Sequence, residues 1–178
     1  MKKALLVMTI GILALGVTWV LTTRYTGTAA SAHDPGEDET SIALGKGKVT
    51  IHYGTPKLGA RNLDEMIKPG EPWFMGMNKP TTLETSLALD FGGKKLGPGK
   101  YAIFARADEQ RNWTFLVSSA ITRALDPATV VVETPLRFSK DGAPQDLLKI
   151  TLEKAGDGAS MVVAWGTYRL SGTFKPAS

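Results

Sequence analysis

Four residues between positions 61 and 79 have side chains suited to holding a small ligand: Arg61, Trp73, Asn78 and Lys79. Arginine presents a planar fork that matches a carboxylate or phosphate, and lysine presents a point charge. Asparagine offers a donor together with an acceptor, and tryptophan offers a flat surface for stacking. These types predict a ligand-binding site for a small anionic or sugar-like molecule.

The same residues have a structural interpretation. Arg61 and Asn78 can pair with loop carbonyl groups that would otherwise lack partners, while Trp73 and the neighbouring Phe and Met residues cover the core. Types and spacing alone do not separate the two interpretations.

The two histidines, His33 and His52, are the remaining candidates for metal chemistry. If a peptidase cut after Ala32, the new α-amino group and the imidazole of His33 could chelate copper, with His52 as a second imidazole. No third ligand is evident, and the absence of cysteine excludes thiolate metal sites, thiol nucleophiles and disulfides. We therefore predict no metal and no cofactor, and keep the copper site at His33 and His52 as an alternative.

No set of residues has the spacing of a known catalytic site. Ser118 and Ser119 lack the glycine-flanked elbow of a hydrolase nucleophile. The acidic residues include no pair that sequence alone can place across a cleft, as glycoside hydrolysis requires. We name no catalytic residue and favour a binding or structural role over an enzyme.

The amino-terminal segment predicts export. Lys2 and Lys3 precede an uncharged, mostly apolar run over residues 4–21, which predicts one apolar helix that is either a signal peptide or a transmembrane anchor within residues 1–25. Ala30-Ser31-Ala32 resembles a cleavage site. Either interpretation places the rest of the chain outside the cytoplasm, in the periplasm or at the cell surface. The protein is then secreted or anchored in the cytoplasmic membrane.

Charge argues against a nucleic-acid partner. The net charge is +4, but Lys2, Lys3 and Arg24 belong to the export segment, and removing them leaves 18 basic residues against 17 acidic ones. Nucleic-acid binding draws its affinity from clustered basic residues. The expected partners are the membrane, through an uncleaved amino-terminal segment, and a small polar ligand or a protein of the cell envelope.

Behind the export segment we expect a flexible linker over residues 26–45 and one β domain over residues 46–178. The linker is rich in small, acidic and turn-forming residues, and its apolar residues follow neither the periodicity of a helix nor that of a strand. In the domain, apolar and polar residues alternate with period two, which is typical of half-buried strands. Strands are predicted over residues 49–53, 83–91, 101–106, 113–118, 129–133, 147–153 and 161–174.

Short strands joined by tight turns predict an all-β fold: an antiparallel β-sandwich or a flattened, jelly-roll-like barrel. Residues 129–133 include three valines and are expected to be covered on both faces. Residues 161–174 are expected to form one long or bent strand with bulges at Gly166 and Gly172. Single helical turns are expected near residues 62–67 and 119–125. The connection over residues 54–80 is unusually long and rich in apolar residues, so we expect it to be ordered and to cover one end or face of the sheet.

Several short blocks resemble the DUF2911 family of exported bacterial proteins. These blocks are Tyr53-Gly54-Thr55-Pro56, Trp73-Phe74-Met75-Gly76-Met77-Asn78, Leu96-Gly97-Pro98-Gly99-Lys100-Tyr101 and Trp113-Thr114-Phe115. The resemblance spans about residues 46–174 and implies an exported β-rich protein without an established activity. It also implies an arginine where this chain has Phe74, and a glutamate and alanine where it has Lys79 and Pro80, so part of the family's polar set is absent here.

Overall fold

A computed structural model describes residues 36–178. The predicted apolar helix, the cleavage site at Ala30-Ser31-Ala32, His33 and the first ten residues of the predicted linker lie outside these residues. Within them the chain forms eleven strands and two short helices. The strands are β1 (Glu37–Leu44), β2 (Gly47–Gly54), β3 (Thr82–Thr85), β4 (Leu89–Asp90), β5 (Lys95–Leu96), β6 (Gly99–Ala107), β7 (Trp113–Ser118), β8 (Val130–Ser139), β9 (Gln145–Ala155), β10 (Gly158–Gly166) and β11 (Tyr168–Pro176). The helices are α1 (Leu63–Met66) and the 3-10 turn η1 (Pro127–Thr129).

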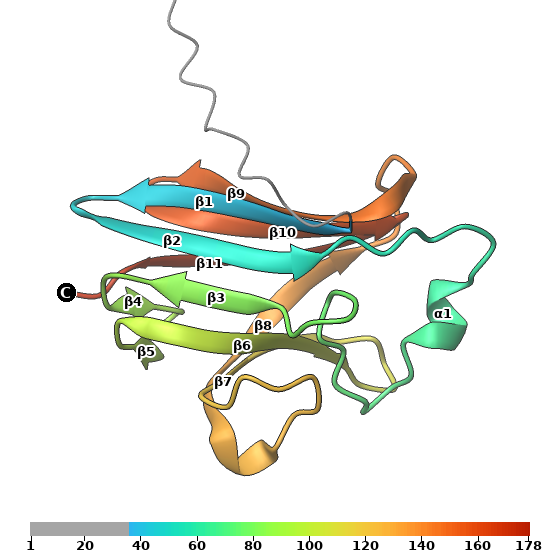
Figure 1. The fold of residues 1–178 in the computed structure, drawn as a ribbon, viewed down its shortest axis with the longest axis horizontal. Coiled ribbons are helices and arrows are strands. Elements are labelled where there is room, and N and C mark those ends of the chain that lie inside the picture. Colours follow the sequence, from blue (N-terminus) through green and yellow to red (C-terminus); the bar gives the residue numbers. More distant parts are fainter. Residues whose placement is uncertain (1–35) are drawn as a thin grey trace, which may run out of the picture. The chain divides into compact units, whose positions relative to one another are not determined.

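The strands form one antiparallel, nearly closed barrel-like sheet, which confirms the predicted fold class (Figure 1). Its order is β1-β2-β3-β6-β7-β8-β11-β10-β9, with the small β4–β5 ribbon attached to β11. The chain just after β2 closes the ring against β9. There Leu58 N donates to Asp146 O at 2.6 Å, and Leu148 N donates to Pro56 O at 3.0 Å.

Alternation along the strands produces the core. In β2, Val49, Ile51 and Tyr53 are buried, while Thr50 and His52 are partly exposed on the other face. The buried faces of strands from both halves of the sheet enclose one large apolar cluster. Burial at about 25 cal/mol per Å² of apolar surface makes this cluster the main source of stability in a domain without disulfides.

The linker prediction is wrong from Glu37 onward. Residues Glu37–Leu44 form β1, which pairs along its whole length with β2 through the turn at Gly45 and Lys46. Only Leu44 of this strand is buried, so β1 is held by backbone hydrogen bonds more than by apolar packing. For this reason the sequence of β1 shows no alternation of apolar and polar residues. The folded domain therefore begins about ten residues earlier than predicted.

The predicted single strand over residues 161–174 is also wrong in part. The chain reverses after Gly166, whose φ of 54° lies in the left-handed region, and continues as the paired strands β10 and β11. A register shift in β10 does occur between Ala164 and Gly166, as predicted for Gly166. Gly172, by contrast, pairs in regular register with Met161.

Three smaller predictions also need correction. Val131 is 48% exposed, so β8 is not covered on both faces. The segment 83–91 is interrupted between β3 and β4, where the Thr85 hydroxyl accepts from Leu87 N and forms a local turn. The helical turn expected at 119–125 falls instead at η1, after Asp126 as its cap.

The turn expected near residues 62–67 is confirmed as α1. Asn62 caps it by accepting from Asp64 N at 3.0 Å. Within residues 36–178 no helix has the length and apolar character required to cross a bilayer.

Candidate functional site

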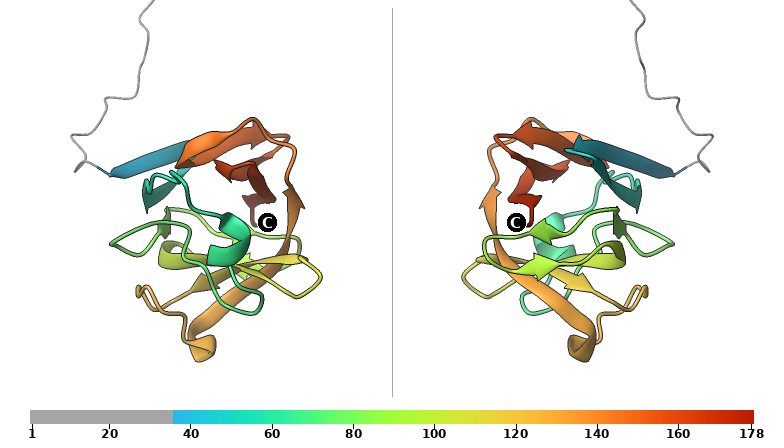
Figure 2. Two further views of the ribbon diagram at one scale, coloured as in Figure 1. Left: turned by 90° about the vertical axis from the view of Figure 1, so that its right-hand side faces the viewer. Right: turned by 90° about the vertical axis from the view of Figure 1, so that its left-hand side faces the viewer.

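The long connection between β2 and β3 lies across one end of the barrel and is ordered, as predicted (Figure 2). Its first part pairs with β9, its middle forms α1, and Trp73 then pairs with Ala105 of β6 through two backbone hydrogen bonds of 2.8 Å. The connection thus carries all four predicted ligand residues.

Arg61 and Trp73 meet at one buried ring, that of Trp165. The Trp73 and Trp165 rings stack at 5.9 Å with an interplanar angle of 13°, and the Arg61 guanidinium carbon lies 5.6 Å from the Trp165 ring centre. Arg61 Nε also donates to Leu58 O at 3.0 Å. These contacts match the structural interpretation of both residues. We call this region, with α1 above it, the capped end.

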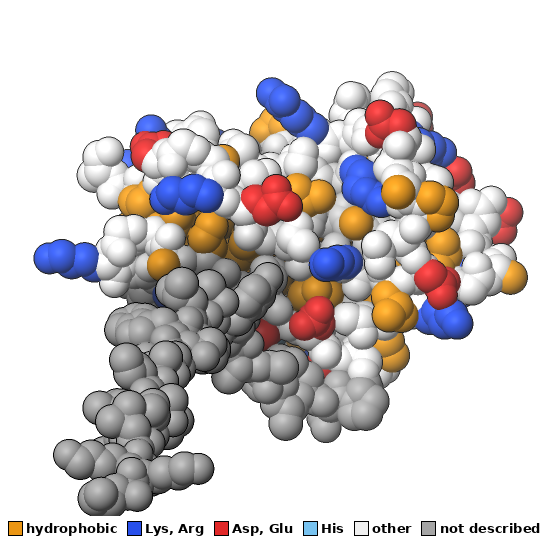
Figure 3. Space-filling view, turned by 90° about the horizontal axis from the view of Figure 1, so that it is seen from above, with side chains coloured by type: hydrophobic (Ala, Val, Ile, Leu, Met, Phe, Trp, Pro, Cys, Tyr) orange, Lys and Arg blue, Asp and Glu red, His pale blue; other side chains and the backbone are white. Residues whose placement is uncertain are grey.

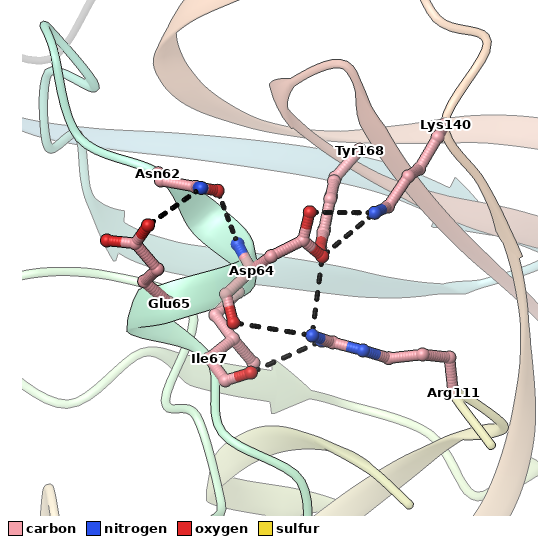
Figure 4. A network of polar contacts seen from close by, with 7 residues as sticks. All are labelled: Asn62, Asp64, Glu65, Ile67, Arg111, Lys140 and Tyr168. Atoms are coloured by element: carbon pink, nitrogen blue, oxygen red, sulfur yellow. Dashed lines mark hydrogen bonds and ion pairs between the residues drawn. The ribbon is translucent and has the colours of Figure 1, made fainter. Parts of the chain in front are cut away.

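A network of charges fastens α1 to the capped end (Figure 4). Lys140 Nζ lies 2.8 Å from both carboxylate oxygens of Asp64, and Arg111 Nη2 lies 3.3 Å from Oδ1. The Tyr168 hydroxyl donates a short hydrogen bond to the same oxygen. Arg111 additionally donates to Ile67 O at 3.2 Å. One carboxylate therefore receives three donors from three segments outside α1.

This network shifts two pKa values in opposite directions. Hydrogen bonds from Lys140 and then from Tyr168 lower the pKa of Asp64, because they stabilise the ionised carboxylate. Burial, followed by the hydrogen bond to Asp64, raises the pKa of Tyr168. At neutral pH the pair is therefore an anionic acceptor and a neutral donor.

Asn78 and Lys79 lie in a strained segment away from the capped end's tryptophans. Met75 and Asn78 have φ values of 49° and 61° in the left-handed region, which asparagine tolerates but which is unfavourable for methionine. The Thr81 hydroxyl donates to Met75 O at 3.0 Å and holds the bend. A Cβ added at Gly54 would lie 2.5 Å from Met77 O, so this segment packs directly on the β2 backbone.

A hollow of about 340 Å³ opens beside this segment, and Lys79 lines it. We call it the hollow; its lining includes Glu37, Asp38, His52, Lys79, Lys100 and Ile121. Lys79 Nζ lies 2.8 Å from Glu37 Oε1, and the Tyr53 hydroxyl donates to Asp38 at 3.0 Å. Burial raises the pKa of Tyr53, so this hydroxyl stays protonated and acts as a donor. Arg61, Trp73 and Asn78 are not among the residues that line the hollow.

His52 lies between the hollow and a second depression of about 370 Å³ on the outer face of β1, β2 and β3. Its Nδ1 lies 3.2 Å from Glu39 Oε2. Among residues 36–178 no group of three or more His, Cys, Asp or Glu side chains has the geometry of a metal site. The alternative copper site depends on His33, which is outside that range.

Phe74, which stands where the family resemblance implies an arginine, is an apolar contact. It packs with Leu125 and Val130 against a small buried cluster on the outer face of β6 and β7, formed by Ala102, Phe104 and Leu116. A charged group there would lose its hydration without gaining a partner from this cluster. Phe74 therefore adds apolar packing to this small cluster at the position where the family resemblance implies a charged side chain.

The Asp64 network was not predicted. Nothing in the sequence spacing of Asp64, Arg111 and Tyr168 connects a one-turn helix with the β6–β7 turn and β11. Arg111 has a φ of 62° in a turn closed by Asp108, which accepts from Asn112 N at 2.8 Å. The Asp-x-x-x-Asn spacing is the one local signal that this turn is rigid.

The fold and this site define a barrel-like β domain with a capped end and an open hollow that charged residues line. A profile of the family described as "Protein of unknown function (DUF2911)" matches residues 35–174, so the chain belongs to this family, and the resemblance stated above is confirmed. The match begins two residues before β1, in agreement with the corrected start of the domain. No curated protein matches the chain, and no solved structure matches it either.

Proposed function

We propose that this domain acts outside the cytoplasm as a binding module for a small polar ligand that carries an acidic group, with the hollow as its binding site. The observation that carries this proposal is the hollow itself. Its volume of about 340 Å³ falls in the usual range for small-molecule sites, and charged groups of both signs converge on it. Lys79 and Lys100 offer cations to a carboxylate or phosphate, while Asp38 and Glu37 accept from ligand hydroxyl or amino groups.

The backbone beside the hollow supports the same proposal. Non-glycine residues with positive φ cost about 1–3 kcal/mol each and tend to occur at functional sites, where surrounding contacts hold them. Met75 is such a residue, four positions before Lys79, and Asn78 has a left-handed conformation that asparagine tolerates at lower cost. Their side chains do not need to touch the ligand, because their conformation places Lys79 and Pro80 at the hollow.

Two other partner classes receive less support from the described surface. On the visible part of the face formed by β1, β9 and β10, acidic and basic side chains are interspersed, which does not favour a nucleic-acid partner (Figure 3). The exposed large apolar residues are Met66 of α1, Ile121 of the loop after β7, Val131 of β8 and Leu147 of β9, so no single element within residues 36–178 presents an apolar stripe to a protein partner.

The test is a calorimetric or NMR titration of the full chain with sugar acids, amino acids and neutral sugars. Replacing Lys100 with alanine removes one cation of the hollow, and Lys94→Ala removes an equally exposed lysine from the β4–β5 turn as a control. We expect acidic ligands to bind. Their affinity for Lys100→Ala should be lower than their affinity for Lys94→Ala by about tenfold or more. Equal affinities in the two variants, or no binding by any acidic compound, would reject the hollow as the site.

A further inference from the structure

The network around Asp64 has the form of a ligand site occupied by a side chain of the same protein. A carboxylate is bound by an ammonium, a guanidinium and a phenol, the donor set that proteins use for carboxylate and phosphate groups of ligands. The three donors, Arg111, Lys140 and Tyr168, come from the β6–β7 turn, the β8–β9 loop and β11. Asp64 belongs to none of these elements.

The donors are held in place by contacts that do not involve Asp64. The Tyr168 ring packs edge-on against Phe138 at 4.9 Å and against Trp113 at 6.2 Å. Lys140 Nζ lies 5.2 Å from the centre of the Tyr168 ring. The turn that carries Arg111 is closed by Asp108 and Asn112. The Tyr168 ring, Lys140 and the backbone turn that carries Arg111 therefore have contacts that do not depend on the Asp64 carboxylate.

The carboxylate itself is accessible and is attached to a weak element. The Asp64 side chain is 44% exposed, so solvent reaches the site. Helix α1 has four residues, and one isolated helical turn has almost no stability of its own. Its buried attachments are Leu63 and Ile67. Arg111 also donates to the backbone carbonyls of Ile67 and Asp64, and these two contacts do not depend on the Asp64 carboxylate.

We propose that Arg111, Lys140 and Tyr168 form a second binding site, for the carboxylate or phosphate group of a ligand, and that Asp64 occupies this site in the structure described here. A tethered group competes at an effective concentration of about the millimolar range or higher. A simple anion therefore binds the wild-type chain weakly and binds strongly once Asp64 is removed. This site is separate from the hollow, so either proposal can fail without the other.

The experiment measures the thermal unfolding midpoint of full-chain variants against acetate and, in a second arm, inorganic phosphate, with chloride keeping the ionic strength constant. In Asp64→Ala we expect a saturable rise in the midpoint, with an apparent affinity at least about tenfold tighter than in the wild type. The acetate and phosphate arms identify which group the site prefers. Adding Lys140→Ala to Asp64→Ala should abolish the response to both anions.

The matched control is Asp157→Ala, which removes an exposed carboxylate from the β9–β10 turn. If Asp64→Ala and Asp157→Ala respond equally to both anions, the proposal is overturned and Asp64 serves only to fasten α1. Should Asp64→Ala not fold, Asp64→Asn provides the same test, because a neutral amide competes less well than a carboxylate. Its anion affinity should then exceed that of the wild type, and an unchanged affinity would overturn the proposal.

Discussion

The capped end and the hollow both include residues of the connection between β2 and β3, yet their polar groups have different surroundings. At the capped end, Arg61 lies against the buried ring of Trp165, and Asp64 receives three donors. In the hollow, Lys79 and Asp38 also have partners, but these partners line an open volume of about 340 Å³. The difference shows that a ligand residue cannot be inferred from its type alone, since arginine and tryptophan stabilise the fold here while lysine faces the open site.

The largest expected difference between the two regions follows from removing Trp165. This side chain is 2% exposed and stacks on Trp73, so Trp165→Ala should lower the free energy of unfolding by about 3–5 kcal/mol. Chemical denaturation measures the change. The control at the hollow is Ile121→Ala, at a residue that is 46% exposed, which should change stability by less than about 0.5 kcal/mol. Similar losses in both variants would contradict the distinction between the regions.

The next effect concerns the contact between β2 and the strained segment. Gly54→Ala places a Cβ 2.5 Å from Met77 O and 2.7 Å from Met77 N, so the backbone has to move. We expect a loss of about 1–3 kcal/mol in unfolding free energy together with weaker ligand binding at the hollow. Gly97→Ala, where a Cβ would meet no atom within 4 Å, is the control and should leave both quantities unchanged. Unaltered ligand binding in Gly54→Ala would separate the hollow from this segment.

A smaller effect on the free energy of unfolding should follow from neutralising the Asp64 carboxylate, which holds α1 to the capped end. Asp64→Asn should cost about 1 kcal/mol, because the carboxylate is partly exposed and its ion pairs are screened by solvent. Since the pKa of Asp64 is lowered in the folded chain, its stabilisation is fully present above the ordinary value near 4 and is lost as the pH falls through the lowered pKa. The dependence of unfolding free energy on pH below about 4 should therefore be flatter in Asp64→Asn than in Asp157→Asn.

The smallest effect on stability is expected in the hollow. Lys100 lies 3.9 Å from Glu84 in an exposed pair, so Lys100→Ala should change the unfolding free energy by less than about 0.5 kcal/mol. Denaturation of this variant and of Lys94→Ala in parallel measures the difference. If Lys100→Ala instead costs as much as Asp64→Asn, the hollow is a structural feature comparable with the capped end.

Period-two patterns predicted most strands, because in strands such as β2 one face is buried and the other is partly exposed. They missed β1, where backbone pairing with β2 replaces apolar burial, and they merged β10 with β11 because Gly166 and Thr167 make a turn with little sequence signature. For the candidate site, the sequence identified the connection that carries it and one residue, Lys79, that lines the hollow. It missed Lys100 and the Asp64 donors, since these contacts join segments between 21 and 104 residues apart.

The sequence by itself determined an all-β domain with a long ordered connection, since side-chain alternation and turn residues act over a few neighbouring positions. It also determined that burial, and not disulfides, must hold the domain together, because there is no cysteine. Only the tertiary structure decided which polar groups of that connection meet partners from β7–β11 and which face the hollow. The physical reason is that the partners of Arg61, Asp64 and Lys79 are set by closure of the sheet, which brings together residues that no local pattern connects.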